Sequence, residues 1–386
     1  MPKSSSINPQ ALAVMGFINV HKPSGMTAHD VVARVRKITG IKQVGHAGTL
    51  DPMATGVLPI ALNQACRLIR FLEDDKVYLA EVLFGQATST DDIEGDSIET
   101  STEMPEPASV AQNLKQFIGQ VEQYPPLYSA VHVGGRRLYE MARKGEVPPE
   151  IPKRTVLVHS IDILGEELGW SSPSNLKLRI HCGSGTYIRS IARDLGQSVD
   201  CPACLCALER ERVGAFSIED SVTLEQLSES VTQHGLESLN AILKSPLDIL
   251  PLKRIELSAE QSRRLGLGQR VAYSVPNSGE TSPEGMAQAQ LNNETWLNGD
   301  ALMAVCQGRL VAICIPNIIS PVPTPVPNSS LAPEQNSLTP VQNSLASDPN
   351  SPATAPNSLV PAPNSLAPVP TSLVPDPNSL APVPTS

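Results

Sequence analysis

Short apolar or alternating stretches predict β-strands at several places along this 386-residue chain. Residues 16–20 and 76–85 have the composition of strands, and residues 176–182 alternate cleanly between apolar and polar side chains. Residues 57–62 are almost entirely apolar, which predicts a strand buried on both faces. The chain therefore holds strands far apart in sequence that can share one sheet.

Helical spacing is found between the first two of these strands. Apolar residues recur on one face at Val31, Val32, Val35 and Ile38. Thr27 is the expected N-cap, with Asp30 completing a variant capping box, and Gly40 is the expected end. A second helix is expected after the glycine-rich turn at 183–186, with Arg189 in its first turn. Strands and helices mixed in this way predict an α+β fold.

Composition divides the chain into four segments. The expected organisation is a disordered N-terminus (1–13), a main folded unit (14–248) with a mobile arm at about 124–152, a smaller unit (249–317) and a disordered tail (318–386). The smaller unit has an internal polar stretch from Pro276 to Asn298.

The tail contains no Lys, Arg, Tyr, Phe or Trp, and Asn-Ser-Leu triplets begin at 336, 343, 357, 364 and 378. Their spacing in multiples of seven resembles a heptad, but the prolines between them forbid a continuous helix. With few groups to bury, the tail is expected to be a disordered extension with polyproline II character. A docking role is the alternative.

The formal net charge of −10 argues against a general nucleic-acid binder, although a local basic face can coexist with an acidic whole. No run of apolar residues is long enough for a transmembrane helix, and residues 1–15 lack the features of a secretory signal. The seven cysteines are odd in number and scattered, as in proteins of a reducing compartment. A cytoplasmic protein is therefore expected.

Three motifs suggest cofactor or metal chemistry, and each is weak. Cys201 and Cys204 form a C-x-x-C without the second pair that zinc requires, so a structural role is expected, with a redox dithiol as the alternative. The glycine-rich turn at 183–186 lacks the lysine of a phosphate-binding loop. The acidic loop at 91–99 does not have EF-hand spacing, and it is expected to face away from any phosphate backbone.

Basic residues cluster in two places. The arm has glycine hinges, tyrosines and four cations, which is the composition of a segment that grips nucleic acid; the cations are Arg136, Arg137, Arg143 and Lys144. A flexible surface hairpin is the alternative for the arm. Residues 34–42 carry four more cations. They can form an RNA-facing patch or an ordinary solvated helix face, and the sequence favours neither interpretation.

The most informative motif is the run Gly45-His46-Ala47-Gly48-Thr49-Leu50-Asp51-Pro52-Met53-Ala54-Thr55-Gly56. It contains one carboxylate, one imidazole and no Lys or Arg, and it leads into the apolar strand at 57–62. Asp51 can thus be held rigidly and partly away from water beside a buried strand.

This run resembles the catalytic motif of the tRNA pseudouridine-55 synthases, the TruB-type family. Residues 22–30, 185–190 and 205–216 resemble three further family motifs, in the right order, so the resemblance covers about residues 15 to 225. It implies a central curved mixed sheet with flanking helices. Residues 249–317 are more weakly similar to the small PUA-like barrel that follows the catalytic domain in this family.

The resemblance implies a role for each site residue. Asp51 acts as the nucleophile or base at the ribose, and Arg189 pairs with it, which orients the carboxylate, lowers its pKa and keeps it ionised. Tyr78 stacks on the target uracil and takes the proton from carbon 5, and Leu208 packs against the same base. His46 fills the space that the flipped base leaves in the RNA. Lys22, in the first motif, is expected to bind substrate.

The implied substrate is the uridine at position 55 in the T-loop of tRNA, and the arm and the basic helix hold its phosphates. No metal or cofactor is required, because the base leaves and returns without a redox step. The partner is the tRNA T-stem-loop; no membrane, no obligate protein partner and a monomer are expected. A non-catalytic tRNA-binding or folding protein and a guide-RNA-dependent enzyme are the alternatives.

Overall fold

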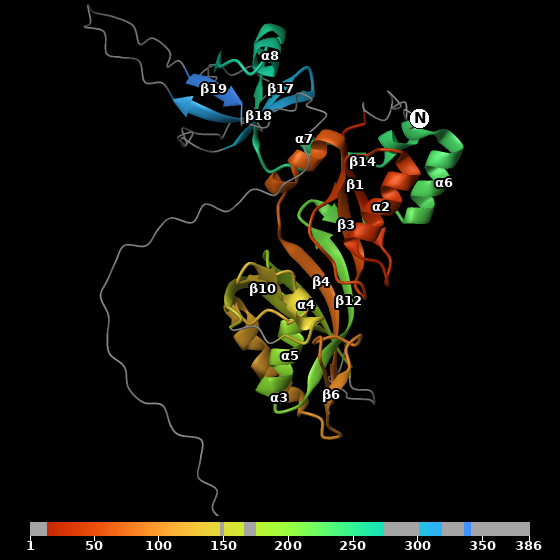
Figure 1. Cartoon of the computed structure of the whole chain (residues 1–386). Coiled ribbons are helices and arrows are strands. Elements are labelled where there is room, and N and C mark those ends of the chain that lie inside the picture. The colour runs from red at the N-terminus through yellow and green to blue at the C-terminus, as the bar shows by residue number, and fades with distance from the viewer. Residues whose placement is uncertain (1–13, 147–149, 166–174, 274–300, 319–335, 341–386) are drawn as a thin grey trace, which may run out of the picture. The chain divides into compact units, whose positions relative to one another are not determined.

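The computed structural model describes residues 14–146, 150–165, 175–273, 301–318 and 336–340 (Figure 1). The expected disordered N-terminus, the polar stretch from Pro276 to Asn298 and most of the predicted tail lie outside these residues. Within the described residues, no helix has the length and apolar character needed to cross a bilayer.

A ten-stranded mixed sheet forms the larger part of the fold. All pairs are antiparallel except the contact between β12 and β3, which is parallel. The main path runs through β14 (Leu243–Lys244), β1 (Gly16–Lys22), β3 (Thr55–Leu62), β12 (Ala203–Val213), β4 (Lys76–Phe84), β11 (Asn175–Cys182), β10 (Arg154–Leu164) and β7 (Gly119–Gln123), with β2 (Val44–His46) on β3 and β13 (Phe216–Ser217) on β12. The strands predicted from the sequence are therefore all present, and they share one sheet.

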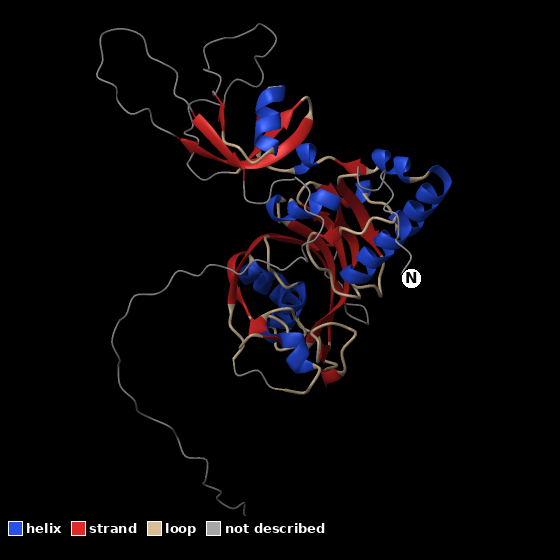
Figure 2. Ribbon diagram, turned by 45° about the horizontal axis from the view of Figure 1, so that its top comes forward, coloured by secondary structure: helices blue, strands red, loops and turns tan. Residues whose placement is uncertain are grey.

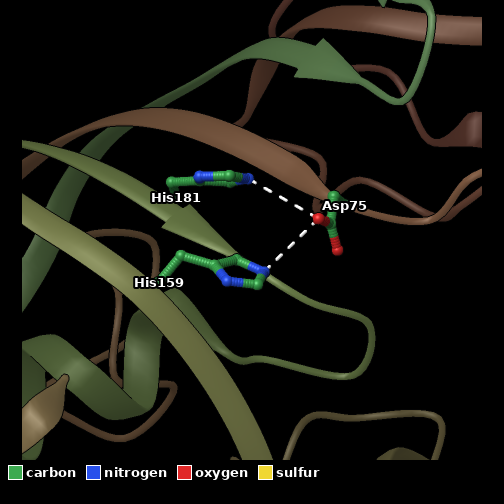
Figure 3. A group of neighbouring side chains, drawn as sticks. All are labelled: Asp75, His159 and His181. Carbon is green, nitrogen blue, oxygen red and sulfur yellow. Dashed lines mark ion pairs between the residues drawn. The ribbon is translucent and has the colours of Figure 1, made fainter. Parts of the chain in front are cut away.

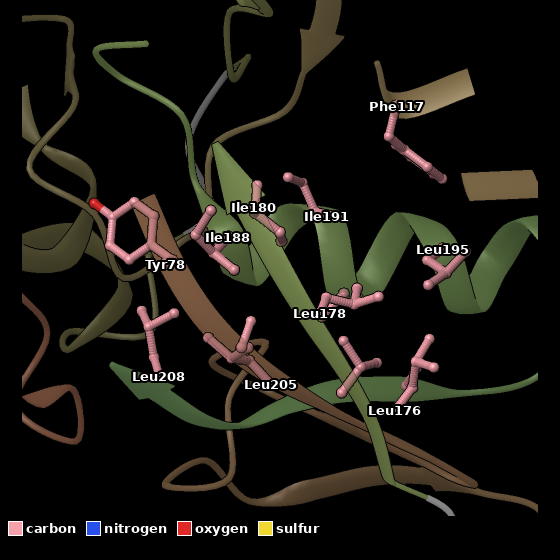
Figure 4. Close-up of a cluster of buried hydrophobic side chains, with 14 of the residues drawn as sticks. Tyr78, Phe117, Leu176, Leu178, Ile180, Ile188, Ile191, Leu195, Leu205 and Leu208 are labelled. Carbon is pink, nitrogen blue, oxygen red and sulfur yellow. The ribbon is translucent and has the colours of Figure 1, made fainter. Parts of the chain in front are cut away.

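Helices cover this sheet at two places (Figure 2). Helix α2 (Ala28–Thr39) packs with α6 (Leu224–His234) against the apolar side chains of β1 and β3. Helix α5 (Ile188–Ser198) and α3 (Pro107–Leu114) cover the inner face of β4, β11 and β12. Figure 4 shows Ile188, Ile191 and Leu195 of α5 within this cluster. The prediction for the first helix is confirmed: Thr27 and Asp30 form the capping box, and Gly40 ends the helix with a φ of 70°. The remaining elements of this part are β5 (Gln86–Thr88), β6 (Ser97–Thr100), β8 (His132–Val133), β9 (Arg136–Arg137), α4 (Leu138–Ala142) and α7 (Pro246–Ile249).

The parallel contact between β3 and β12 requires a glycine. Gly56 lies opposite Arg210 with a φ of +98°. A Cβ atom at this position would lie 2.3 Å from the Arg210 carbonyl oxygen and 2.8 Å from its backbone nitrogen. Because both neighbours are backbone atoms, neither can move aside without parting the strands.

A separate five-stranded sheet follows in sequence, in the order β15 (Lys253–Glu256), β17 (Leu302–Cys306), β18 (Arg309–Ile318), β19 (Asn336–Pro340) and β16 (Val271–Tyr273). Helix α8 (Ala259–Gly266) contributes Leu265 to its small core. Over the described residues this sheet is an open path, so the structure shows a small β-domain here, and the PUA-like barrel stays a prediction.

Strand β19 corrects the prediction that the chain is disordered from residue 318 onward. Residues 336–340 pair with both β16 and β18, and β18 itself reaches Ile318. The physical reason is that β16 and β18 leave a gap with unpaired backbone groups on both sides, which five residues can satisfy even with few apolar side chains. Composition alone does not detect such a partner.

Replacing Gly56 with Ala should destabilise the fold by about 3 kcal/mol or more, because it combines a backbone clash with a strained positive φ. The free energy of unfolding in urea measures this change. The matched control is Gly266→Ala, where an added Cβ meets nothing within 4 Å. Equal stability of the two variants would contradict the close approach of β3 and β12.

Candidate active site

Asp51 lies in the loop between β2 and β3, and the backbone of this loop is fixed on several sides. The Gly25 N–H donates to the Pro52 carbonyl at 2.8 Å, and the Ser24 hydroxyl donates to the Met53 carbonyl at 3.1 Å. Within the loop, the Ala54 N–H donates to the Asp51 carbonyl at 3.1 Å. The turn after β1 therefore holds the residues that follow the carboxylate.

Lys22 is a buried cation that holds the same loop. Its side chain is fully buried, and its ammonium donates to the carbonyls of Pro23 at 2.9 Å, Met26 at 2.5 Å and Pro52 at 3.0 Å. Burial lowers the pKa of Lys22 to about 8, and the nearby Asp51 carboxylate opposes that change. An ammonium with all three protons donated to carbonyls has no donor left for a phosphate. The ammonium therefore supports the loop, and a role of Lys22 in binding substrate stays a prediction.

Arg210 is a second buried cation on the other side of the loop, and it was not among the predicted site residues. Its guanidinium donates to the carbonyls of Val57 at 2.8 Å, Gly48 at 3.2 Å and Thr49 at 3.4 Å, and its side chain is fully buried. One signal was available in the sequence: Arg210 is two residues after Leu208 on one strand, so both side chains face the same way.

Arg189 joins the loop to the rest of the site. Its Nη2 donates to Asp51 Oδ1 at 3.0 Å, and its Nε lies 2.9 Å from Asp51 Oδ2. The guanidinium is almost completely buried, and it also donates to the carbonyls of Thr90 at 3.0 Å and Tyr128 at 3.2 Å. Two residues 138 positions apart in the chain are thus locked together.

A second carboxylate, Asp92, shares Arg189. Its Oδ2 lies 3.3 Å from Arg189 Nη1, and its side chain is buried. This residue belongs to the acidic loop at 91–99, which was expected to face away from any phosphate backbone. The chain turns here and brings the Asp92 carboxylate inward, where its Oδ1 accepts from the Thr90 hydroxyl and the Glu94 N–H. The direction of the loop relative to phosphates stays a prediction.

The balance of charges sets the pKa of Asp51. Burial raises this pKa above its ordinary value, Arg189 and Lys22 lower it, and Asp92 adds to the rise. The net direction is upward, so the expectation that Arg189 would hold the pKa of Asp51 below normal is wrong: desolvation outweighs the ion pair. Arg189 still limits the rise and fixes the orientation of the carboxylate.

Tyr78 and Leu208 form an apolar wall of the same region (Figure 4). Both are only 7% exposed, and they belong to one cluster with Leu50 and Ile188, which are neighbours in sequence of Asp51 and Arg189. Burial raises the pKa of Tyr78 to about 12, although the Arg210 guanidinium beside its hydroxyl opposes the rise. The phenol is therefore protonated at neutral pH.

His46 ends β2, five residues before Asp51. Its ring packs edge-on against His29, with 5.4 Å between the ring centroids, and burial lowers its pKa. The imidazole is therefore neutral at neutral pH, which suits packing among bases more than binding a phosphate.

The four cations of the arm are all exposed, as a phosphate-binding role requires. Arg136 is paired with Glu146 at 2.5 and 3.1 Å, and Arg137 donates to the Tyr139 hydroxyl at 2.9 Å. Arg143 lies over the ring of Tyr139, with 5.5 Å to its centroid. These contacts hold the guanidinium groups together on one short segment.

The cysteines of the C-x-x-C pair, Cys201 and Cys204, are both buried and free. Burial raises the pKa of Cys204 to about 12, which suppresses the thiolate that redox exchange needs. The structural interpretation of this pair is therefore favoured.

Comparison with known families identifies the chain. Residues 36–188 match the model of the TruB family pseudouridylate synthase N-terminal domain, and residues 189–250 match that of the tRNA pseudouridylate synthase B C-terminal domain. The chain belongs to the TruB family. Asp51 and Tyr78 lie in the first matched region, and Arg189 begins the second.

Curated TruB-family relatives are similar over most of their length. The tRNA pseudouridine synthase B of Trichormus variabilis is 45% identical over 273 residues, covering 69% of this chain and 89% of that protein. The protein of the same name from Synechococcus elongatus is 39% identical over 297 residues, covering 77% of this chain and 97% of that protein. Among solved structures, a Cbf5-Nop10-Gar1 complex aligns with a TM-score of 0.56 at 24% identity, over 81% of this chain and 85% of that one, which shows a shared fold.

In this TruB-family chain, Lys22→Met should lower the free energy of unfolding by about 2 to 3 kcal/mol, because three carbonyls lose their buried donor. The lowered pKa means that the unfolded state binds more protons above about pH 8. The advantage of the wild type over the variant should therefore grow as the pH rises from about 8 towards 10.5. Urea unfolding at several pH values measures both effects.

The control is Lys37→Met, which removes an exposed lysine of α2. This control should leave the free energy of unfolding within about 0.5 kcal/mol of the wild type. A Lys22 variant as stable as this control at every pH would show that the buried ammonium does not hold the loop.

Proposed function

We propose that this chain isomerises uridine to pseudouridine in tRNA, at position 55 of the T-loop. The observation that carries the proposal is the ion pair between the partly exposed Asp51 carboxylate and the buried Arg189 guanidinium, set in a rigid loop beside the apolar wall of Tyr78 and Leu208. Membership of the TruB family supports it, as do the names of the relatives. The enzyme class is an isomerase that moves a base within one nucleotide.

Asp51 is proposed to act at the ribose. The reaction breaks the bond between N1 of the base and C1′ of the sugar, turns the base, and joins C5 to C1′. A carboxylate can stabilise or covalently trap the electron-poor C1′ between these two steps. The proton lost from C5 balances the one gained at N1, so the product is an isomer and no oxidant or reductant is consumed.

The apolar wall is proposed to hold the free base. The phenol of Tyr78 can stack on the uracil, and Leu208 can pack against it from the next strand, where Leu208 pairs with Ala80 of β4. If Tyr78 also takes the proton from C5, its high pKa requires help, and Arg210 beside the hydroxyl is positioned to stabilise the phenolate. This would give Arg210 two tasks, one at the loop and one at the base.

A uridine within a folded RNA must leave its stack for its ribose to reach this ion pair. His46 is proposed to occupy the space that the flipped base leaves, and the exposed cations of the arm to contact the phosphates. Three side chains of α5 tie the root of the arm to the site: Ser190 and Arg193 donate to the Tyr124 carbonyl at 2.8 and 3.0 Å, and Arg189 donates to that of Tyr128. The arm is thus anchored on the helix that carries the catalytic arginine.

The domain organisation is part of the same proposal. Residues 14–248 form the catalytic domain, with the arm at about 124–152, and the small sheet that begins near residue 249 forms part of a PUA-like domain. The proposal also includes that the protein acts on tRNA in the cytoplasm as a monomer. It needs neither a membrane nor an obligate protein partner.

Asp51→Asn should abolish turnover and leave tRNA binding within about tenfold, or about 1.4 kcal/mol, of the wild type. The substrate is an unmodified tRNA transcript with tritium at C5 of its uridines. The wild type should release one equivalent of tritium, which sequencing of the product places at position 55. Tritium release by the variant would overturn the role of Asp51.

The matched control is Arg136→Ala, which changes the arm and not the buried pair. It should weaken binding, flatten the dependence of binding on salt, and leave the rate at saturation unchanged. A wild-type protein that binds tRNA and releases no tritium would instead support the non-catalytic tRNA-binding function.

Asp92→Asn should shift the acidic limb of the pH–rate profile to lower pH. The ionised form of Asp51 is the reactive one, so activity falls as the pH falls through its raised pKa. Asp92 contributes to that rise by like-charge repulsion, so its removal lowers the pKa of Asp51. Single-turnover rates between about pH 4.5 and 8 measure the shift, with Asp96→Asn, an exposed acid of the same loop, as control. A shift to higher pH would contradict the assigned charge balance.

A further inference from the structure

A second group of ionisable side chains lies outside the site described above. Asp75, His159 and His181 converge from three separate segments (Figure 3). Asp75 Oδ2 lies 3.3 Å from Nε2 of His159 and 3.7 Å from Nε2 of His181, and the two rings have centroids 4.4 Å apart. Both histidines are 32% exposed and Asp75 is 48% exposed, so the cluster is open to solvent.

The local fold explains why these side chains meet. His159 is the extra residue of a β-bulge in β10, between the pairs Val158–Cys182 and Ser160–His181. A bulge redirects a side chain and leaves its residue without a pairing partner, which here places one imidazole beside the other. Asp75 directly precedes β4, and its carbonyl accepts from the Gly214 N–H at 2.9 Å, which fixes its backbone.

The cluster lies on the face of the sheet opposite the proposed catalytic site. In β11 the neighbours Ile180 and Cys182 point into the core that contains Tyr78, whereas His181 points the other way. The cluster therefore takes no part in the chemistry proposed for Asp51, and its arrangement calls for a different explanation.

We propose that Asp75, His159 and His181 form a binding site for one divalent transition-metal ion of the zinc, cobalt or nickel class. Two imidazoles and one carboxylate are a donor set that such ions favour. Metal–nitrogen bonds of about 2.0 to 2.1 Å in tetrahedral geometry place neighbouring ligand atoms about 3.3 to 3.4 Å apart. The two distances from Asp75 Oδ2 to the histidine nitrogens come within a few tenths of an ångström of this separation.

The third separation, between the ligand nitrogens of His159 and His181, must shorten when the metal binds. The ligand atoms of the three residues all lie within 4.8 Å of one another, so the two imidazole nitrogens have to approach by no more than about 1.4 Å. Rotation of partly exposed rings supplies this movement without a change in the backbone. Water completes the coordination from the open side.

Arg212 competes with the metal for His181. Its Nη2 lies 3.3 Å from His181 Nε2, and because arginine has no acceptor, it donates to the lone pair that a metal would use. The guanidinium also repels a cation at this place. Metal binding therefore requires Arg212 to swing away, and a variant without this charge should bind the metal more tightly.

The test is a titration of the full-length protein with Co²⁺, followed by absorption and by calorimetry. One equivalent should bind with d–d bands of nitrogen and oxygen ligands and without the intense near-ultraviolet band of cobalt bound to thiolates, which separates this site from the cysteines. His159→Ala and His181→Ala should each weaken binding about tenfold or more, and His234→Ala, an exposed histidine of α6, should leave it unchanged. Arg212→Gln should bind about fivefold tighter than the wild type.

Several outcomes would overturn the inference. These are no uptake of Co²⁺ at millimolar concentration by either the wild type or Arg212→Gln, binding that survives both histidine substitutions, or a spectrum dominated by thiolate ligands. An unchanged affinity in Arg212→Gln would refute the competition. The histidine variants are checked by circular dichroism, and since each alters a partly exposed side chain, two independent substitutions keep the test meaningful if one misfolds.

Discussion

The site depends on one arrangement: the carbonyl groups around Asp51 point at two buried cations. Lys22 binds the Pro52 carbonyl and Arg210 binds those of Gly48 and Thr49, so the loop is held on both sides of the carboxylate. Leu50 and Ala54 pack this loop into the core, but its backbone carbonyls need donors as well. Charge-assisted hydrogen bonds from inside the protein supply them, and because both donors are withdrawn from water, the bonds are strong and directional.

This arrangement also determines how charge is distributed. Lys22, Arg189 and Arg210 are buried near Asp51, Asp92 and the hydroxyl of Tyr78, so each group alters the others. A carboxylate whose pKa is raised by desolvation is more nucleophilic than one stabilised by full hydration, whereas the ion pair keeps it from being neutralised. The site therefore balances the reactivity of the Asp51 carboxylate against its ionisation. Arg189 serves this balance, because its ion pair limits the rise in the Asp51 pKa that desolvation causes.

The sequence predicted much of this fold, but not the buried cations that hold the loop around Asp51. Strand patterns, the caps at Thr27 and Gly40, and the motifs around Asp51, Tyr78 and Arg189 were all visible because they depend on local spacing or on family resemblance. The structural roles of Lys22 and Arg210 were missed because a cation is ordinarily expected at the surface, and only the tertiary fold shows which carbonyls it binds. The inward position of Asp92 and the strand β19 were not predicted for a related reason, because each depends on a partner distant in sequence. Asp92 is placed by Arg189, and β19 is placed by the gap between β16 and β18.

The parallel contact between β3 and β12 has a consequence for how the protein is made. Arg210 follows Gly48 by 162 residues, and Arg189 follows Asp51 by 138. During synthesis the loop that carries Asp51 emerges early, but its second buried cation arrives only when β12 has left the ribosome. Contacts of such long range form slowly, because the intervening chain must be closed into a loop first. The surroundings of Asp51 are thus completed only when β12 joins β3 to β4, and a partly made chain carries the aspartate without Arg189 and Arg210.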